Sequence, residues 1–360
     1  MRSQLLRSFF PPPTFLTLRS VGFDVSDQSV KYVELIQSEH GLKLGVYGST
    51  SIPLGLISSG KIVDQPSLVS IFGKLKKDKG LNYIRVSLPE EQIYSFRQVI
   101  PAVPYKEIRN TLELSLEEHI PIDASDATFD FKIIGQEQDN LYVQVSAVST
   151  SLVSSYVNTF NEASLVPLSF ELEGAALARA LVLKGDQGTY LIADFGETRT
   201  GISIVSAGIV LFTSTIDIGG YGLTKMIEKS FGIPFTEAEA MKRTYGLHKA
   251  KDNTDLFSVL INGVSVLRDE INKHLIYWQT HKDEDGKERK QVEKILLSGG
   301  NANMNGLSEY LSQSLRIKVE LGNPWVNVTG YKHGVPPMNA REAVGFATAI
   351  GLALGHYEND

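Results

Sequence analysis

The sequence predicts an α/β fold in which two similar domains face one cleft and a small α+β subdomain is inserted into the first domain. A strand that ends in an aspartate, a tight polar turn and two further strands occur over residues 21–53 and again over residues 189–220. Asp24 and Asp194 thereby occupy equivalent units, 170 residues apart. The length of 360 residues exceeds what one compact core organises and suits two to three domains.

Composition and charge narrow the class of protein. The 35 basic and 41 acidic residues leave a net charge of −6 beside 42% hydrophobic residues, which is an ordinary globular balance rather than a disordered one. This slight acidity argues against a dedicated nucleic-acid binder, which would carry a basic excess. The sequence contains no cysteine, so disulfides, cysteine nucleophiles and thiolate metal sites are excluded.

Residues 1–19 are expected to form an N-terminal tail. They are basic and apolar, but Pro11, Pro12 and Pro13 interrupt them and no small-residue cleavage site follows an apolar run, so a secretory signal is not indicated. The first ten residues either contact a membrane surface or a partner through a short amphipathic helix, or remain a solvated tail. No segment reaches the roughly 20 apolar residues that span a bilayer.

The first domain is expected over residues 20–83. Its strands cover residues 21–36, around a turn at residues 26–29, and then residues 42–53. A helix follows, with Pro66 near its start and Gly80 after its end. Apolar residues at helical spacing form one face of this helix and lysines form the solvated face: Leu68, Ile71, Phe72 and Leu75, against Lys74, Lys76, Lys77 and Lys79.

A subdomain inserted into the first domain is expected over residues 84–170. A strand over residues 84–89 leads to a second strand that ends near residue 104, and a helix over residues 105–121 stops at Pro121. Alternating strands at residues 127–135 and 141–149 and a helix at residues 151–165 complete an α+β unit. Residues 171–188 then return to the first domain.

The second domain is expected over residues 189–335. Helices follow its strands at residues 221–231, at residues 237–246 with Thr236 as cap and Gly246 as stop, and at residues 255–281. Residues 283–290 form an exposed charged turn. Residues 292–315 read as a buried strand, a glycine turn and a helix, followed by a strand at residues 316–325. In the final segment, residues 336–360, a helix over residues 340–355 is rich in Ala and Gly and suits close packing on the first domain.

Three turns that lie far apart in the sequence have complementary chemistry. The first holds Asp24 with Ser26, Asp27, Ser29 and Lys31; the second holds Asp194 with Gly196, Thr198 and Thr200; the third is Ser298-Gly299-Gly300. Two facing strand-end carboxylates can hold a hydrated Mg²⁺. Turn N–H groups and hydroxyls can bind phosphate oxygens, and a Gly-Gly turn lets a base and ribose lie against the backbone.

In this order the three turns resemble the motifs of the actin-like ATPase superfamily: GFDVSDQSVK its first phosphate motif, DFGETRT its second and ILLSGGNANMNGL its adenosine motif. Within that superfamily, residues 15–357 resemble the PilM family of type IV pilus assembly proteins, which is related to the division protein FtsA. The segments LELSLEEHIPIDASDATFDFKIIG, IDIGGYGLTKMI, EAEAMKRTYG and EAVGFATAIGLAL carry this resemblance. It implies actin-like (ribonuclease H-like) duplicated domains around a nucleotide cleft, with a PilM/FtsA-type insertion.

The resemblance also implies residue roles for ATP and Mg²⁺. Asp24 and Asp194 would flank the metal and contact it through water. Glu173 would orient the attacking water, or else is a polar residue that starts a helix. The nucleotide would lie against residues of five segments: Ser26, Asp27, Ser29 and Lys31; Gly196, Glu197, Thr198 and Thr200; Glu239 and Lys242; Gly299 and Gly300; and Met304.

Three departures from the family pattern bear on turnover. Ser26 and Asp27 stand where relatives usually carry Gly and Ser, the second turn lacks a second glycine, and Asn301 replaces a frequent third glycine. An added carboxylate beside a triphosphate is repulsive unless it points away or binds metal. Because phosphoryl transfer needs a positioned water and neutralised charge, we expect nucleotide binding with slow or negligible hydrolysis.

Three hypotheses for function follow from the resemblance. The first is a cytoplasmic adaptor at the inner face of the cytoplasmic membrane, which binds the N-terminal cytoplasmic peptide of PilN beside the inserted subdomain and joins other pilus platform proteins. The second is an FtsA-like filament-forming division protein, disfavoured because no amphipathic C-terminal helix is expected after residue 355. The third is an actin-superfamily sugar kinase, disfavoured because its insertions would be longer.

Overall fold

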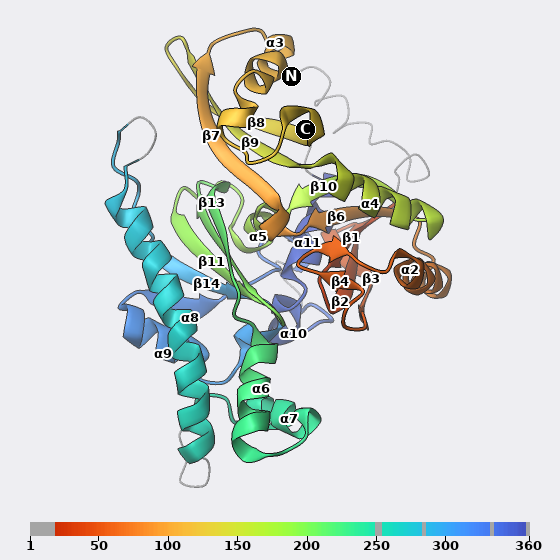
Figure 1. Cartoon of the computed structure of the whole chain (residues 1–360), viewed down its shortest axis with the longest axis vertical. Coiled ribbons are helices and arrows are strands. Elements are labelled where there is room, and N and C mark those ends of the chain that lie inside the picture. The colour runs from red at the N-terminus through yellow and green to blue at the C-terminus, as the bar shows by residue number, and fades with distance from the viewer. Residues whose placement is uncertain (1–18, 249–253, 283–285, 332–334, 358–360) are drawn as a thin grey trace.

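The computed structural model describes residues 19–248, 254–282, 286–331 and 335–357. The N-terminal tail, most of which precedes residue 19, and part of the charged turn at residues 283–290 lie outside them. Two five-stranded sheets form the centre of the molecule, and a smaller sheet lies at one end (Figure 1). No helix in these ranges is long and apolar enough to cross a membrane.

The two large sheets repeat one strand order. The first runs β10-β6-β1-β2-β3 and the second β15-β14-β11-β12-β13, each with an antiparallel three-strand meander beside two parallel strands. The first sheet consists of β1 (Ser20–Val25), β2 (Ser29–Ser38), β3 (Gly41–Ser51), β6 (Tyr83–Leu88) and β10 (Val166–Leu172). The second consists of β11 (Thr189–Phe195), β12 (Thr200–Ser206), β13 (Ile209–Ile216), β14 (Lys294–Ser298) and β15 (Lys318–Leu321). The predicted duplication is therefore present strand for strand.

The first domain packs helices α2 (Gln65–Lys79) and α4 (Thr150–Glu162) on one face of its sheet. The carboxylate of Asp64 caps the first turn of α2 through the Ser67 N–H, and Gly80 ends the helix in a left-handed conformation, as the sequence indicates. Phe23 of β1 meets the rings of Phe72 and Phe160 at centroid distances of 5.5 and 5.9 Å, which joins the sheet to both helices. The short strands β4 (Ile57–Ser58) and β5 (Lys61–Ile62) form a hairpin before α2.

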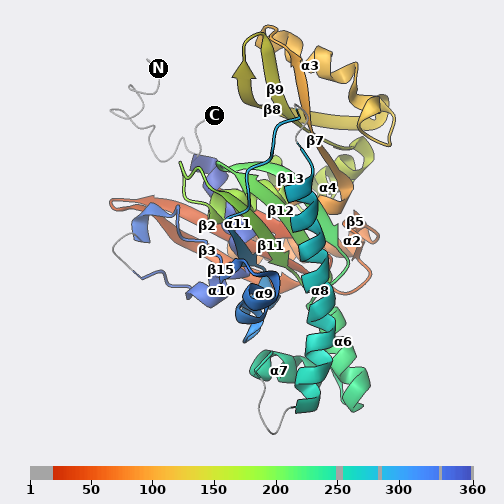
Figure 2. The same cartoon turned by 90° about the vertical axis from the view of Figure 1, so that its left-hand side faces the viewer.

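The inserted subdomain is smaller than expected. Its sheet, β7-β9-β8, is built from β7 (Ile93–Pro101), β8 (Ala127–Glu137) and β9 (Asn140–Ser149), and α3 (Tyr105–Glu113) covers it (Figures 1 and 2). We call residues 93–149 the insert. The expected range of 84–170 is too wide, because β6 and β10 pair in parallel within the first sheet and α4 packs on that sheet's core. Alternation of apolar and polar residues along the chain indicates a strand, but it does not show which sheet the strand joins.

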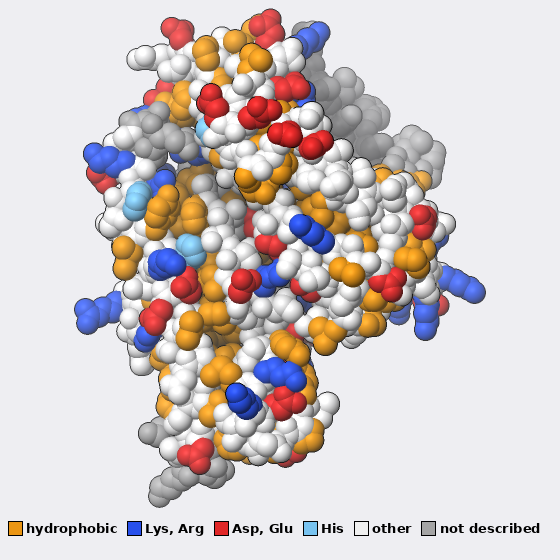
Figure 3. All heavy atoms as spheres, viewed as in Figure 1, with side chains coloured by type: hydrophobic (Ala, Val, Ile, Leu, Met, Phe, Trp, Pro, Cys, Tyr) orange, Lys and Arg blue, Asp and Glu red, His pale blue; other side chains and the backbone are white. Residues whose placement is uncertain are grey.

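Two further boundaries in the insert differ from the sequence prediction. The helix expected over residues 105–121 ends at Glu113, and the chain continues in the short 3-10 turns Leu116–Glu118 and Ala124–Asp126. The Ser115 hydroxyl and N–H both donate to the Leu112 carbonyl, which ends the helical ladder there. The insert holds nine acidic and four basic residues, and acidic side chains gather on its surface (Figure 3).

The second domain carries helices α6 (Gly220–Phe231), α7 (Phe235–Tyr245), α8 (Thr254–Thr280) and α9 (Leu307–Leu315). Helix α8 runs the length of this domain, and its lower part projects with α6 and α7 (Figure 2). Thr236 is not the cap of α7: the helix begins one residue earlier, because the Pro234 carbonyl accepts the N–H groups of Glu237 and Ala238. Gly246 ends α7 as predicted.

Two helices cross between the domains. Helix α5 (Glu173–Leu181) follows a first-domain strand yet contacts β11, β12 and β13, whereas α11 (Ala347–Leu354) follows the second domain yet contacts β1 and β2. They meet where a Cβ on Gly351 would lie 1.8 Å from the Ala176 carbonyl oxygen, and Gly22 of β1 leaves only 1.9 Å to the Ala349 oxygen. Glycines at these two positions allow the backbones to approach this closely.

The final helix is interrupted. In place of one helix over residues 340–355, α10 (Ala340–Val344) ends before Gly345, and α11 starts at Ala347. The Val344 carbonyl accepts the Gly299 N–H at 3.2 Å and the Ser298 hydroxyl at 3.3 Å instead of continuing the helix. The interruption thus fastens the C-terminal segment to the glycine turn of the second domain.

Candidate functional site

The turns after β1 and β11 face each other across a cavity of about 390 Å³, which we call the cleft cavity. The turn after β14 and the chain that follows β6 complete its wall. It brings together twelve of the residues singled out in the sequence: Asp24, Ser26, Asp27, Ser29, Lys31, Glu173, Asp194, Gly196, Glu197, Thr198, Gly299 and Gly300. Asp24 and Asp194, which are 170 positions apart in the sequence, therefore line the same cavity, as the duplication predicts.

A second cavity of about 470 Å³ adjoins the cleft cavity, with which it shares Lys31, Glu197, Gly300 and Asn301 among its lining residues. Met304 and the ring of Phe346 line it, which gives it an apolar wall beside the glycine turn. The two cavities form a continuous site with carboxylates and hydroxyls at one end and apolar and amide groups at the other.

Burial dominates the electrostatics of the cleft cavity. It raises the pKa of both Asp24 and Asp194, while the Lys31 ammonium acts in the opposite direction on each. The Ser87 hydroxyl also donates to the Asp24 carboxylate at 2.9 Å. Burial, with the neighbouring carboxylates of Asp24 and Glu90, lifts the pKa of Glu173 well above its usual range. Among the residues that the structure describes, no group of three or more acidic, histidine or cysteine side chains could by itself hold a metal ion.

Glu90 belongs to this site and has no signal in the sequence. It lies in the short turn Glu90–Gln92 between β6 and β7, is 7% exposed, and its carboxylate accepts the Gly174 N–H at 3.3 Å. It therefore caps the N-terminus of α5 from a residue 84 positions away. Burial raises the pKa of Glu90, and hydrogen bonds from Thr213 and Gly174 oppose this.

Two residues singled out in the sequence do not line the site. Thr200 is fully buried and donates to the Ile218 carbonyl at 2.6 Å, so it ties β12 to the chain that follows β13. Glu239 accepts from Lys242 at 2.8 Å and from Arg243 at 2.6 Å, because all three lie on one face of α7. Lys242 does line the second cavity, but its ammonium is already bound to the Gly220 carbonyl and the Asn301 amide oxygen, both at 3.0 Å.

The departures in the phosphate turns have structural roles. The Asp27 carboxylate accepts the N–H groups of Gly60 and Ser59 at 3.0 and 3.3 Å, so the β4–β5 hairpin occupies it. Asn301 donates from its amide nitrogen to the Gly196 carbonyl at 2.9 Å and thereby ties the second and third turns together. A third glycine at that position would lose this bond.

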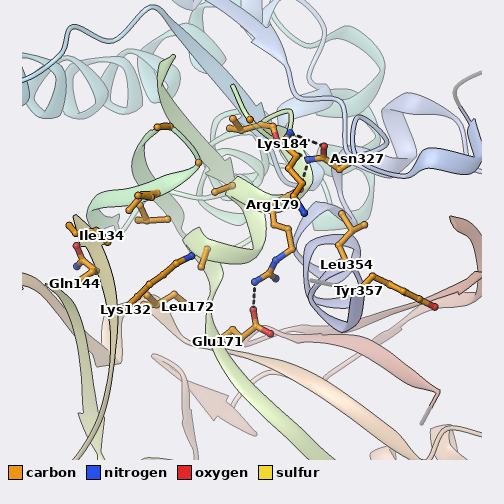
Figure 4. Close-up of a pocket in the computed structure, with 18 of the residues that line it drawn as sticks. Lys132, Ile134, Gln144, Glu171, Leu172, Arg179, Lys184, Asn327, Leu354 and Tyr357 are labelled. Carbon is orange, nitrogen blue, oxygen red and sulfur yellow. Dashed lines mark hydrogen bonds and ion pairs between the residues drawn. The ribbon is translucent and has the colours of Figure 1, made fainter. Parts of the chain in front are cut away.

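A third cavity, of about 630 Å³, lies on the side of α5 that faces the insert; we call it the insert groove (Figure 4). Strand β8 of the insert lines one side, β10 and α5 the floor, and the β12–β13 turn and the C-terminal segment the far side. This is the position beside the inserted subdomain where the family resemblance implies a peptide groove. The structure gives the groove an apolar lining that includes Phe131, Ile134, Phe170, Leu172, Val182, Ile209 and Leu354.

Charged groups in the insert groove are partly neutralised. Arg179 donates to the Glu171 carboxylate at 2.8 Å, and Asn327 holds the Arg179 carbonyl at the same distance (Figure 4). Lys132 of β8 and Lys184 after α5 line the groove from different elements. The groove thus combines an apolar floor with two lysines at its edges and the edge strand of the insert sheet.

Comparison with known proteins gives one match across nearly the whole chain. The family model for type IV pilus assembly protein PilM matches residues 22–357. Cell division protein FtsA of Escherichia coli (strain K12) is 24% identical over 187 residues, which cover 46% of this chain and 42% of that protein. The alignments therefore span less than half the length of the curated relatives.

Solved structures agree on the fold. A PilM-PilN type IV pilus biogenesis complex matches with a TM-score of 0.79 and 22% identity, covering 95% of this chain and 99% of that chain. The ethanolamine utilization protein EutJ of Carboxydothermus hydrogenoformans matches with a TM-score of 0.57, 17% identity and coverage of 96% and 90%. MreB5 of Spiroplasma citri bound to ADP matches with a TM-score of 0.52, 14% identity and coverage of 88% and 95%.

Proposed function

The chain belongs to the family of type IV pilus assembly protein PilM, and from this premise we propose that it is an ATP-binding adaptor of the pilus assembly platform. It binds the N-terminal cytoplasmic peptide of PilN and through it stays at the inner face of the cytoplasmic membrane. The observation that carries the proposal is that helix α5 lines two cavities: the carboxylate-lined cleft cavity at its start and the apolar groove beside the insert along its length.

ATP and Mg²⁺ fit the residues of the two joined cavities. Asp24 and Asp194 would hold the metal through its water ligands, since Mg²⁺ keeps several waters and takes few carboxylates. The turns at residues 26–29 and 196–198 would receive the phosphates on N–H and hydroxyl groups. Met304 and Phe346 would border the adenine, with Gly299 and Gly300 beneath the ribose.

Slow hydrolysis is part of this proposal. Glu173 is the residue placed to orient water, but burial and nearby carboxylates favour its protonated form, which cannot accept a proton. We therefore assign Glu173 a water-positioning role in a protein that retains ATP far longer than it hydrolyses it.

The insert groove is the proposed peptide site. Strand β8 is at the edge of the insert sheet, so its backbone is available to pair with an extended peptide while the apolar floor takes alternate side chains. The groove lining itself carries charges of both signs, Asp130 and Glu171 beside Lys132, Arg179 and Lys184, so its apolar residues are the main basis for peptide binding. Contacts with other platform proteins and self-association remain further parts of the proposal.

Titration of the protein with a labelled synthetic PilN N-terminal peptide, with and without ATP–Mg²⁺, tests the adaptor function. Ile134→Asp in the groove is expected to weaken binding about tenfold or more, as loss of an anchor worth about 1.4 kcal/mol would. Ile133→Asp is the matched control, because that neighbour is 40% exposed and does not line the groove. Failure of the unmodified protein to bind in either condition rejects the adaptor function.

A filament-forming division role is the alternative, and the partial match to FtsA is the observation that favours it. Sedimentation of the protein with ATP–Mg²⁺ discriminates between the two. A pelleting polymer without peptide binding supports the division role, whereas peptide binding by a protein that stays in the supernatant supports the adaptor.

A further inference from the structure

Arg199 links the two domains at the cleft cavity. It lies in the turn between β11 and β12 of the second domain, and its guanidinium pairs with the Glu91 carboxylate of the first domain. The same guanidinium donates to the Ser59 hydroxyl at 2.7 Å and lies 3.9 Å from the Asp27 carboxylate. Its remaining ion pair, at 3.2 Å, is with Asp217 of its own domain. Three contacts thus reach across the cavity from one side chain.

The partners of Arg199 lie at the base of the insert. Glu91 belongs to the turn Glu90–Gln92, which leads directly into β7, the first strand of the insert. The neighbouring Glu90 caps α5, and Gln92 donates to the Ser59 carbonyl at 2.9 Å. Since β7 also contacts β13 of the second domain, a shift of this turn changes the position of the insert relative to α5. The insert and α5 are both part of the wall of the insert groove.

The charge balance around Arg199 favours exchange of its partners. One guanidinium faces three carboxylates, of which Asp27 and Glu91 are 15% and 23% exposed and Asp217 is 93% exposed. Burial raises the pKa of Glu91 in spite of the opposing effect of Arg199, and Asp27 and Asp217 add to the rise. A phosphate beside Arg199 would compete for its N–H groups and repel Glu91.

We propose that Arg199 is a phosphate-binding residue whose guanidinium is paired with Glu91 as long as no nucleotide is bound. When ATP binds, Arg199 leaves Glu91 and pairs with the terminal phosphate, and this exchange couples the cleft cavity to the insert. The proposal rests on the nucleotide binding proposed above and adds a regulatory path to it. Arg199 and Glu91 both line the cleft cavity, within the same wall as the two phosphate turns. Peptide affinity at the insert groove then depends on whether ATP is bound.

The test compares Glu91→Gln with Asp217→Asn. Each substitution removes one carboxylate charge from Arg199, but only the first removes an ion pair between the domains. Glu91→Gln is expected to tighten ATP–Mg²⁺ binding at least about fivefold, the lower range of coupling between sites, while Asp217→Asn stays within twofold. Hydrogen exchange of the β7 amides, residues 93–101, is expected to change on ATP addition in the unmodified protein and to be altered in Glu91→Gln without nucleotide.

The outcomes separate this inference from the proposed function. If the unmodified protein binds ATP but both variants behave alike, or its β7 exchange is indifferent to ATP, the coupling is wrong and the nucleotide site stands. If the unmodified protein binds no ATP, the nucleotide site is wrong. The exchange of β7 in nucleotide-free Glu91→Gln then still decides whether the Arg199 contact controls the base of the insert, and melting curves identify any variant that fails to fold.

Discussion

Individual carboxylates in the cleft cavity are held at an energetic cost in the nucleotide-free protein. The buried groups Asp24, Glu173 and Asp194 all have a raised pKa, so the folded state binds protons more tightly than the unfolded chain does. Their contribution to stability is complete below the unfolded pKa and is lost as the pH rises through the folded pKa. A site of this kind gains stability when a divalent cation arrives.

Glu173→Gln should therefore stabilise the nucleotide-free protein at pH 7. The glutamate must either keep a buried negative charge or take up a proton at this pH, both of which cost free energy, whereas glutamine is neutral. A gain of about 1 kcal/mol raises the melting temperature of a domain of 150–250 residues by roughly 2–4 °C, and this larger chain by somewhat less. The gain should disappear as the pH falls below 4.5, the usual pKa of glutamate, because the original residue is then protonated in both states. Melting curves across this pH range check it, with the exposed Glu118→Gln as control. A gain that persists at low pH would contradict the assignment.

Asp194→Ala should abolish the thermal stabilisation by ATP–Mg²⁺, since the residue lines the cleft cavity and is one of the two carboxylates proposed to hold the metal. Saturation at about 100 times Kd stabilises a protein by about 2.7 kcal/mol, so the loss is easily measured. Asp255→Ala, on the exposed start of α8, provides the matched control. An undiminished shift in Asp194→Ala would place the nucleotide elsewhere.

At this scale the sequence predicts the residues whose signal is local. Asp24 and Asp194 end buried strands and precede tight turns, which a single stretch of sequence displays. Glu90 and Arg199 carry no such signal, because their partners lie 84 and 108 positions away and only the folded chain brings them together. Glu239 shows the converse, since its helical neighbours Lys242 and Arg243 occupy the carboxylate.

Elements were predictable where their ends are marked by special residues. Pro66 and Gly80 bound α2, and Gly246 ends α7, because each acts through its own backbone conformation. The break between α10 and α11 was not predictable, since the carbonyl of Val344 bonds to Gly299 from a distant turn. The allocation of β6 and β10 to the first sheet likewise depends on partners remote in sequence.

The crossing of α5 and α11 gives a prediction at the scale of elements. Gly351→Ala would place a Cβ 1.8 Å from the Ala176 carbonyl oxygen, so the helices must separate, at a cost of about 1–3 kcal/mol. Gly73→Ala in α2 is the control, because nothing lies within 4 Å and the higher helix propensity of alanine stabilises by up to about 1 kcal/mol. Urea unfolding of both variants should give shifts of opposite sign; equal shifts would refute the close contact.

The whole molecule combines a duplicated frame with one removable subdomain. Ile93 at the start of the insert pairs with Val148 near its end, and the insert has its own core of Leu112, Val143 and Val145. The actin-like frame was predictable from the repeat of Asp24 and Asp194, whereas the limits of the insert required the sheet topology. The groove required it too, because segments far apart in the sequence build its wall.

Replacement of residues 93–149 by a short Gly-Ser link should therefore leave the ATP–Mg²⁺ thermal shift intact and abolish binding of the PilN peptide. The ends to be joined are already neighbours on β7 and β9, so the link imposes little strain. Calorimetric titration measures both ligands on the same preparation. Retained peptide binding would move the peptide site off the insert.

The exchange of helices between the domains has a consequence for synthesis on the ribosome. When residue 188 has left the exit tunnel, the first sheet is complete in strands, yet the surface of β1 around Gly22 is bare because α11, its cover, is the last helix to be made. Apolar residues of β1 and β2 therefore remain uncovered while more than 150 further codons are translated. Because exposed apolar surface makes a nascent chain prone to aggregation, we expect the first sheet to need protection until Ala347–Leu354 has been made.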